Sequence, residues 1–511
     1  MTAGVPRHDL DAPAVIDGGH RLSRGQLEAR AARLAGGLRD RAGVRPGHRV
    51  AFDLSARAEY FELHAAVSAL GASLVAVGRG LDGDAARRVV ADSGARVAVL
   101  DAPERLGAAF GRGPAVPALD TVVWVGEEPW AGALAYESLV EGSSPVLDID
   151  SGPAPAALVY TSGTTGRPKA ALRELGPDAR RARAAMYADL FGTLGFRSGD
   201  RHLLCCGVDH AQPAFYARHT LERGGSVLVM RDFEAEAALD LIESEAVTTA
   251  FLVPHMLRRI LGLPESSRRG RELASLRALI SGGSALPPAL RQEVTALFGD
   301  RCLFDLYGSV ELGLVTVLEP GDAPSRPSSV GRPLAGVGIR IVDEAGRRLG
   351  PGELGRVFVR SPVQVAGYVD DEPAFAAAAQ DGFFAPGDLG RVDEDGYLYL
   401  VDRAAEVVRV DGQSVFPERV EEVLRNHPAV LDAAVYDVGD GEYVRLGAAI
   451  ELGAGASLDI RELTALAARR LEPHECPELL RVVSALPRNA LGKVMKHALG
   501  APRADGEAGR A

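Results

Sequence analysis

The sequence predicts an α/β protein in which a large N-terminal domain of α/β layers, carrying a β-rich subdomain, precedes a small α+β C-terminal domain. Three observations predict this class. The chain has 511 residues, too many for one hydrophobic core of the usual size. Short apolar runs alternate with amphipathic stretches from residue 20 to about 310. After about residue 330, short apolar runs follow one another between tight turns.

The first helix is predicted from its capping pattern. Ser23 and Gln26 have the spacing of a capping box, in which each side chain hydrogen-bonds the backbone N–H of the other residue. The helix that follows would direct Leu27, Leu34 and Leu38 inward, since this spacing puts them on one face. A glycine and a proline soon after residue 40 are expected to end it.

Seven short apolar runs are predicted as buried strands. They lie at residues 49–54, 73–77, 96–100, 121–125, 226–230, 248–253 and 276–281. Amphipathic stretches separate many of them, for example at 234–245 and 287–298. Alternation of this kind predicts βαβ units and largely parallel sheets.

The pattern changes after about residue 330. Segments 338–349, 355–361 and 395–403 contain short strands separated by acidic turns that include glycine. They predict an antiparallel sheet or a small barrel.

A compact α+β unit of about 100 residues is predicted from Arg403 onward. Its elements are a first strand, a helix at 418–426, two strands around the turn 439–441, a helix at 458–471 and a strand at 479–485. We therefore expect domains at 1–402 and 403–498. The polar, glycine-containing tail at 499–511 is expected to be disordered.

Composition excludes several classes of function. Hydrophobic residues make up 47% and charged residues 25%, as in ordinary globular proteins. A net charge of −12 without a broad basic stripe argues against a nucleic-acid partner.

Neither a signal peptide nor a membrane span is expected, so the protein is predicted to be cytoplasmic. The four cysteines lack zinc or redox spacing, and adjacent Cys205 and Cys206 are expected to be buried.

The strongest functional signal is the segment LVYTSGTTGRPKA at residues 158–170. An apolar strand runs into six small residues, which are Thr161, Ser162, Gly163, Thr164, Thr165 and Gly166. Glycines let several backbone N–H groups converge on an anion, and hydroxyls add donors. Lys169 at the rim adds positive charge. The loop is predicted to bind phosphate, although it is not a Walker A loop; the alternative is a surface turn.

The segment YTSGTTGRPK resembles the signature of the adenylate-forming (AMP-binding) superfamily, which includes acyl-CoA synthetases, peptide-synthetase adenylation domains and luciferases. Further family motifs follow in order: SGGSALPP at 281–288, LYGSVE at 306–311, GFFAPGDLG at 382–390, VDRAAEVVRVDG at 401–412 and LPRNALGKV at 486–494. Ordered motifs across most of the chain are more specific than any one motif. The chain looks most like the fatty- or aromatic-acid CoA ligases.

The resemblance implies an enzyme that uses ATP and Mg²⁺. Lys493 matches the catalytic lysine, whose ammonium would stabilise charge that develops on the α-phosphate. Glu311 matches the magnesium carboxylate, and Thr161 would add a hydroxyl ligand, so both are also expected to be catalytic. Asp388 would accept hydrogen bonds from ribose hydroxyls, and Arg403 would contact ribose or phosphate.

The resemblance also implies contacts with the base and the acid. Expected nucleotide-binding residues besides the phosphate loop are Gly282, Gly283, Ser284, Asp305, Leu306, Tyr307 and Gly308, with Tyr307 stacking on adenine. The acid pocket is expected around Asp209, His210, Gly282 and Gly308.

Two residues of that pocket have alternative interpretations. His210 matches a histidine of acyl-CoA synthetases, or it is a core histidine. Asp209 alternatively matches the carboxylate with which amino-acid-activating relatives hold an α-amino group.

Four positions depart from the family pattern. Val310 replaces a threonine next to Glu311, Pro386 replaces another threonine, and Ala170 replaces a glycine of the phosphate loop. Ala405 occupies the family's hinge, about which the C-terminal domain swings between adenylating and thioester-forming arrangements. The resemblance thus implies a mobile small domain, and alanine still permits its rotation.

The implied reaction is adenylation of a carboxylic acid followed by thioester formation with coenzyme A. One alternative is an enzyme that loads a carrier protein. Another acts without coenzyme A on an unusual acid such as nitrite, which the departures from the pattern favour. A third is an inactive nucleotide-binding protein. The charged residues that the motifs retain argue against it; they are Lys169, Glu311, Asp388, Arg403 and Lys493. The expected partner is a small-molecule acid, and a homodimer is an expected oligomeric state.

Overall fold

The computed structural model describes residues 9–102, 119–127, 130, 132–146, 157–161, 169–174, 176–369, 371–410, 412–439, 444–453, 455–489 and 492–499. The predicted phosphate-loop residues 162–166 and the predicted tail beyond Leu499 lie outside these ranges, as does the side chain of Thr161. In the described part of the chain, no helix is both long enough and apolar enough to cross a membrane.

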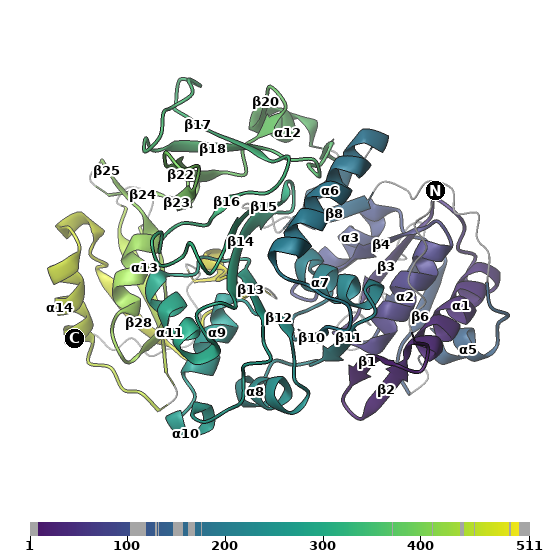
Figure 1. Cartoon of the computed structure of the whole chain (residues 1–511). Coiled ribbons are helices and arrows are strands. Elements are labelled where there is room, and N and C mark those ends of the chain that lie inside the picture. The colour runs from purple at the N-terminus through teal and green to yellow at the C-terminus, as the bar shows by residue number, and fades with distance from the viewer. Residues whose placement is uncertain are drawn as a thin grey trace.

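A nine-stranded sheet forms the centre of the molecule (Figure 1). In spatial order its strands are β16 (Arg332–Pro333), β15 (Gly313–Leu318), β14 (Leu303–Ser309), β13 (Ala278–Gly282), β12 (Thr249–Phe251), β10 (Arg201–Leu204), β11 (Ser226–Val229), β1 (Pro13–Asp17) and β2 (His20–Ser23). The strands from β14 to β1 are parallel, and the outer strands are antiparallel. Parallel strands buried on both faces are what the continuous apolar runs predict.

Helices cover this sheet. They are α6 (Pro177–Thr193), α7 (Ala211–Glu222), α8 (Ala235–Ser244), α9 (Pro254–Leu261), α10 (Glu265–Arg268) and α11 (Pro288–Phe298). The amphipathic stretches at 234–245 and 287–298 are confirmed as α8 and α11.

A second, fully parallel sheet lies in the N-terminal part (Figure 1). It contains β4 (Ser73–Ala76), β3 (Arg49–Asp53), β5 (Val97–Leu100), β6 (Thr121–Trp124) and β7 (Leu134–Ala135), with helices α1 (Arg24–Asp40), α2 (Ala58–Ala69), α3 (Gly83–Ser93) and α5 (Tyr136–Glu141). Ser23 and Gln26 form the predicted capping box of α1. Leu27, Leu34 and Leu38 are buried, as their spacing predicts.

A three-stranded sheet carries the end of the predicted phosphate loop. It pairs β8 (Ala157–Thr161) with β9 (Lys169–Arg173) and β9 with β19 (Gly367–Tyr368). Thr161 and Lys169 are partners across β8 and β9, so the two ends of the predicted phosphate-loop segment lie side by side.

The β-rich part forms an open antiparallel sheet, which decides between the two predicted alternatives, a sheet and a small barrel. Its strands are β17 (Gly338–Val342), β18 (Gly355–Arg360), β20 (Ala379–Gln380), β21 (Phe383–Phe384), β22 (Asp388–Val392) and β23 (Leu398–Arg403), and α12 (Glu372–Ala378) lies beside them. This part occupies the top of the molecule in Figure 1.

The C-terminal part has an apolar core of its own, to which Leu424, Val435 and Leu463 belong. Its elements are β24 (Val408–Val410), β25 (Gln413–Val415), α13 (Pro417–Arg425), β26 (Val430–Asp437), β27 (Leu446–Leu452), α14 (Ile460–Arg470) and β28 (Leu479–Val483), with single 3₁₀ turns at Pro473–Glu475 and Lys496–Ala498. The structure therefore confirms the predicted fold class, a large α/β part followed by a small α+β domain.

One buried ion pair ties a helix to the central sheet. Arg291 on α11 lies 2.7 Å from a carboxylate oxygen of Asp305 on β14, and both side chains are almost fully buried. Burial raises the pKa of Asp305, and Arg291 opposes that rise. Removal of one partner would leave a buried charge without compensation.

We therefore expect Arg291→Met to lower the free energy of unfolding by about 3–5 kcal/mol in urea denaturation followed by circular dichroism. The double variant Arg291→Met/Asp305→Asn should recover much of this loss, because no charge then stays behind. Equal losses in the single and double variants would contradict this explanation.

Candidate active site

The carboxyl ends of the central parallel strands meet at one edge of the sheet (Figure 1). Asp209 and His210 follow β10, Val253 follows β12, and Gly282 and Tyr307 lie at or near the ends of β13 and β14. Ligands of parallel α/β sheets bind outside these ends. The edge therefore collects residues that are far apart in the sequence.

Close backbone packing explains two glycines at this edge. A Cβ atom on Gly282 would lie 2.8 Å from the carbonyl oxygen of Leu306, and one on Gly308 would lie 2.3 Å from that of Gly313. Either contact is too short for a real side chain. Gly282 therefore allows β13 to lie close to β14, and Gly308 allows β14 to lie close to β15.

A phenol, a carboxylate and a guanidinium form a chain beside β14. The Tyr307 hydroxyl donates a hydrogen bond to buried Asp388, and Arg403 Nε lies 3.5 Å from the other Asp388 oxygen. Asp388 and Arg403 are cross-strand partners on β22 and β23. Burial and the neighbouring Asp388 raise the pKa of Tyr307 well above its usual value, so the phenol stays protonated. The carboxylate can accept further hydrogen bonds from a ligand.

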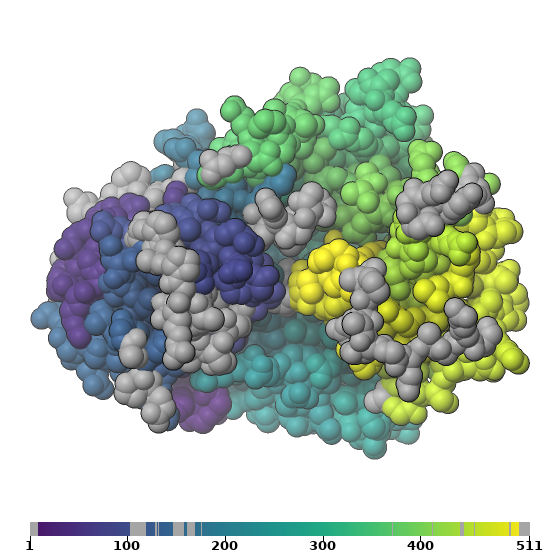
Figure 2. Space-filling view, turned by 180° about the vertical axis from the view of Figure 1, so that it is seen from behind, coloured from purple at the N-terminus to yellow at the C-terminus, as the bar shows by residue number. Residues whose placement is uncertain are grey.

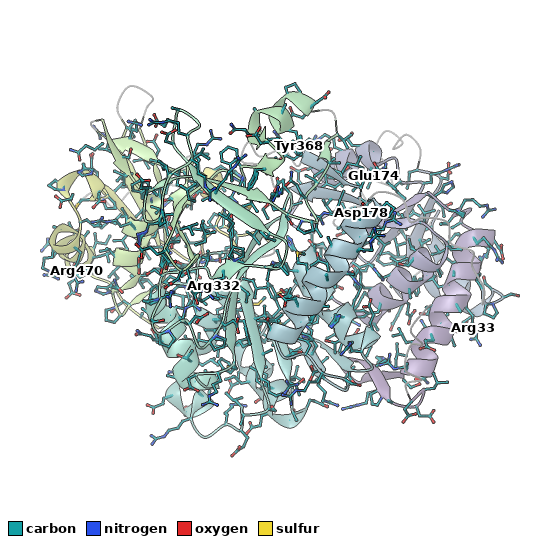
Figure 3. All side chains as sticks on the ribbon, turned by 45° about the horizontal axis from the view of Figure 1, so that its top comes forward. Arg33, Glu174, Asp178, Arg332, Tyr368 and Arg470 are labelled. Carbon is teal, nitrogen blue, oxygen red and sulfur yellow. The ribbon has the colours of Figure 1, made fainter. Side chains whose placement is uncertain are left out.

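Glu311 is held from two sides in the turn between β14 and β15. The Tyr368 hydroxyl donates to Glu311 Oε1 at 2.9 Å, and the Val365 N–H donates to the Glu311 carbonyl at 2.8 Å. Lys169 lies 5.3 Å from the centre of the Tyr368 ring and 2.8 Å from Asp371. In Figure 3, Tyr368 lies on the β-rich part, whose β19 pairs with β9.

The residues around Glu311 fit Mg²⁺ that arrives with phosphates. A fixed carboxylate is a suitable ligand, and no group of three metal-ligating side chains occurs among the described residues. Mg²⁺ commonly takes only one or two carboxylates and completes its shell with phosphate oxygens and water. Thr161 ends β8 opposite Lys169, but its side chain lies outside the described part.

Lys493 reaches this region from the small domain. Its ammonium lies 3.4 Å from Glu406, which also pairs with Lys496 at 3.1 Å. Burial and the nearby Arg403 lower the pKa of Lys493, whereas Glu406 acts to raise it. For Glu406, burial acts to raise the pKa. The positive charges of Lys496 and Lys493 outweigh this effect and hold the pKa of Glu406 below its usual value. Glu406 is therefore shared between Lys493 and Lys496.

The Lys493 loop packs directly on the large domain. A Cβ atom on Gly492 would lie 3.2 Å from His255 Cβ and 3.4 Å from a methyl of Val253. The φ angle of Gly492 is +73°, a conformation that favours glycine. Seen from behind, the yellow C-terminal part lies against the middle of the molecule (Figure 2). Lys493 and the ends of the large-domain strands therefore face the same region.

Asp209 and His210 lie at the start of α7. The Asp209 side chain is buried and accepts a hydrogen bond from the Arg79 N–H at 2.9 Å. His210 Nε2 lies 3.9 Å from Asp209, and burial lowers the pKa of this histidine. Asp209 Oδ1 and His210 Nε2 are buried without hydrogen-bond partners among the described residues. Gln212 Oε1 is 3.7 Å from where a Cβ on Gly282 would be, so this segment meets the end of β13.

Aromatic side chains pack behind these polar groups. Ring centres are 4.6 Å apart for Tyr187 and Phe215, and 5.6 Å apart for Tyr216 and Phe251. Cys205 and Cys206 are buried free thiols, as predicted, and both approach the Phe251 carbonyl oxygen. The wall behind α7 is therefore apolar and largely aromatic.

The predicted nucleotide-binding residues differ in whether their side chains are free to meet a ligand. The Asp305 carboxylate is occupied by Arg291, and Leu306 is buried in the sheet. Gly283 and Ser284 are exposed in the turn after β13. Sequence reasoning missed the contribution of Tyr368; the pairing of β19 with β9, which no local pattern reveals, brings it to Glu311.

Two family models match the chain. The model described as "AMP-binding enzyme" matches residues 3–369, and "AMP-binding enzyme C-terminal domain" matches residues 419–493. Fatty acid–[acyl-carrier-protein] ligase ScoC from Streptomyces coeruleorubidus is 31% identical over 96% of this chain and 94% of its own. A feruloyl-CoA synthase from an Amycolatopsis species is 32% identical, over 95% and 94% respectively.

Solved structures resemble the whole fold. Amide bond synthetase McbA from Marinactinospora thermotolerans matches with a TM-score of 0.81 and 27% identity, over 96% of each chain. The o-succinylbenzoate CoA synthetase MenE from Bacillus subtilis, in complex with an acyl-adenylate, matches with 0.80 and 26%, also over 96% of each. The names of these similar proteins differ in what the acid is joined to or what bond is made. Two name coenzyme A, one names a carrier protein, and one names an amide bond.

With Lys493 as the expected catalytic ammonium, Glu406→Gln should shift the alkaline limb of pyrophosphate release to lower pH. Glu406 raises the pKa of Lys493, so its loss lowers that pKa, and the ammonium then loses its proton at lower pH. The measurement is the initial rate of pyrophosphate release as a function of pH. Glu422→Gln, at an exposed position on α13, is the matched control and should keep the original profile. Identical profiles for wild type and Glu406→Gln would contradict the coupling.

Proposed function

Because the chain belongs to the AMP-binding enzyme family and is thus an adenylate-forming enzyme, we propose that it activates a carboxylic acid with ATP and transfers the acyl group to coenzyme A. In the first step the carboxylate attacks the α-phosphate of ATP and pyrophosphate leaves. In the second, the thiol attacks the acyl carbonyl, AMP leaves and the thiol proton passes to solvent. The proposed functional units are residues 1–402 and 403–498.

One observation carries this proposal. The Lys493 loop of the small domain packs on the segment after β12, next to Arg403 and at the edge where β13 and β14 end. A half-buried ammonium in this position can stabilise the negative charge that develops on the α-phosphate. Electrostatic stabilisation of this kind is often the largest single contribution to catalysis.

The large domain and Arg403, at the start of the small one, supply the proposed nucleotide contacts. Asp388 accepts the ribose hydroxyls, Arg403 contacts ribose or phosphate, and Tyr307 stacks on adenine. Lys169 and the phosphate loop bind phosphate oxygens. Glu311, with Thr161, holds Mg²⁺, which neutralises phosphate charge when bound.

The wall behind α7 favours an apolar acyl group, including an aromatic one. The partly buried rings of Tyr187 and Phe215 pack over the fully buried Tyr216 and Phe251, and partly buried rings can accept further aromatic contacts. His210 lies at the start of this wall, and burial keeps it uncharged at neutral pH. A neutral imidazole next to an apolar wall suits an uncharged acyl chain.

A carrier protein is the second candidate acceptor. This candidate rests on the similarity to the fatty acid–[acyl-carrier-protein] ligase ScoC, which extends over 96% of the chain. Carrier loading uses the same first step, and only the source of the attacking thiol differs.

The test is pyrophosphate release with ATP and Mg²⁺ across fatty, aromatic and amino acids and nitrite, with coenzyme A, with a phosphopantetheinylated carrier protein and without acceptor. We expect release that depends on one apolar carboxylic acid, and a thioester with coenzyme A. A thioester with the carrier protein only would establish the second candidate. Release with no thioester, or release with nitrite alone, would contradict the proposal.

Lys493→Ala should lower the rate of pyrophosphate release by about 10²-fold or more, because it removes a contact made in the transition state. ATP affinity measured by calorimetry should stay close to that of the wild type. Arg469→Ala, at an exposed position of α14, is the matched control. An unchanged rate in Lys493→Ala would remove this lysine from the mechanism.

A further inference from the structure

Strand β9 directs two cations to one side of the three-stranded sheet. Lys169 and Arg173 are separated by four positions, so both side chains point to the same face. Lys169 lies near Tyr368, which holds the Glu311 carboxylate. Arg173 lies at the other end of the strand and contacts the residue just before Glu311. The two cations of one strand thus flank the Glu311 turn.

The contact of Arg173 is with the backbone of this turn. Its Nη2 donates a hydrogen bond to the Val310 carbonyl oxygen at 2.5 Å. Its Nε is buried and has no hydrogen-bond partner among the described residues. Burial lowers the pKa of Arg173, and Glu311 acts in the opposite direction. A buried guanidinium that is only partly hydrogen-bonded costs stability, so a role other than stabilising the fold would explain it.

Val310 is the departure from the family pattern that stands next to Glu311. Its side chain is 37% exposed, so the large apolar group contributes little packing here. It also lacks the hydroxyl that the family has at this position. The turn is therefore held by other contacts: Tyr368 on the Glu311 carboxylate, Val365 on the Glu311 carbonyl and Arg173 on the Val310 carbonyl.

We propose that Arg173 is a positioning residue that fixes the Val310–Glu311 turn, so that the Glu311 carboxylate is oriented for Mg²⁺ bound to the ATP phosphates. The inference rests on the proposed function and deepens it. A metal that takes only one or two protein carboxylates depends on their orientation, since water and phosphate supply its other ligands. Groups that orient a metal ligand commonly affect metal affinity by 10-fold or more, even though they do not touch the metal.

A structural role and this positioning role predict different results. If Arg173 only stabilised the fold, Arg173→Met would lower the melting temperature and leave the Mg²⁺ dependence of ATP binding unchanged. Under the proposal, the melting temperature is kept or raised, because an apolar group replaces a buried cation. The contribution of Mg²⁺ to ATP affinity falls instead.

The experiment is calorimetry of ATP binding to the full chain, with Mg²⁺ and with a chelator in its place. We expect Arg173→Met to reduce the Mg²⁺-dependent gain in ATP affinity by about tenfold and to leave binding with chelator unchanged. Arg173→Lys keeps a donor for the Val310 carbonyl and should recover part of the gain. Arg183→Met, at an exposed position on α6, is the matched control and should resemble the wild type.

Two outcomes would overturn the inference. Wild-type binding that depends on Mg²⁺, with the same dependence in Arg173→Met and Arg173→Lys, would refute the role of Arg173 and leave the proposed function intact. A wild type that binds no ATP would refute both. The melting temperatures of all variants identify a loss that comes from unfolding.

Discussion

The contact between the Lys493 loop and the start of α9 is the constraint on which the rest of the site depends. The large domain supplies Asp388, Glu311 and the strand ends, but the ammonium of Lys493, the proposed catalytic group, belongs to another domain. The close fit of Gly492 against Val253 and His255 places Lys493 next to the large domain. A side chain at position 492 would meet both the short distance and the positive φ angle.

Charged groups surround this contact. Burial and the nearby Arg425 lower the pKa of Arg258 on α9 to about 10, while Asp432 acts to raise it. Burial and Arg488 lower the pKa of His255 to about 4, so this histidine is neutral at physiological pH. Interfaces between domains that move relative to each other are commonly more polar than a domain core. Such a boundary suits a small domain that docks and releases.

Local patterns predicted much of the fold. The apolar runs became the strands of both parallel sheets, because a strand buried on both faces leaves a continuous apolar signal. The capping box at Ser23 determined the start of α1. The choice between an open sheet and a barrel was beyond local patterns, because it depends on which strands pair.

The site was predictable only where a motif carries its residues. Glu311, Asp388 and Lys493 stand in motifs. The contacts of Tyr368 with Glu311 and of Glu406 with Lys493 join distant segments, so only the structure reveals them. Arg173 looks like an ordinary strand residue until β9 is placed beside the Val310 carbonyl. Asp305, just before the LYGSVE motif, is expected to contact the nucleotide, and local patterns gave no sign of its buried ion pair with Arg291.

We propose that the small domain is docked here in the arrangement in which the acid is adenylated. Gly262 at the end of α9 and Leu431 on β26 lie across the boundary, since a Cβ on Gly262 would be 4.0 Å from a Leu431 methyl. A short bismaleimide can link cysteines at these positions, in a Cys476→Ser background because Cys476 is the half-buried free thiol. The measurement is acid-dependent exchange of pyrophosphate into ATP, beside thioester formation. We expect the linked enzyme to keep exchange and to lose thioester formation. If linking abolishes exchange while the unlinked variant stays active, the observed docking is not the adenylating arrangement.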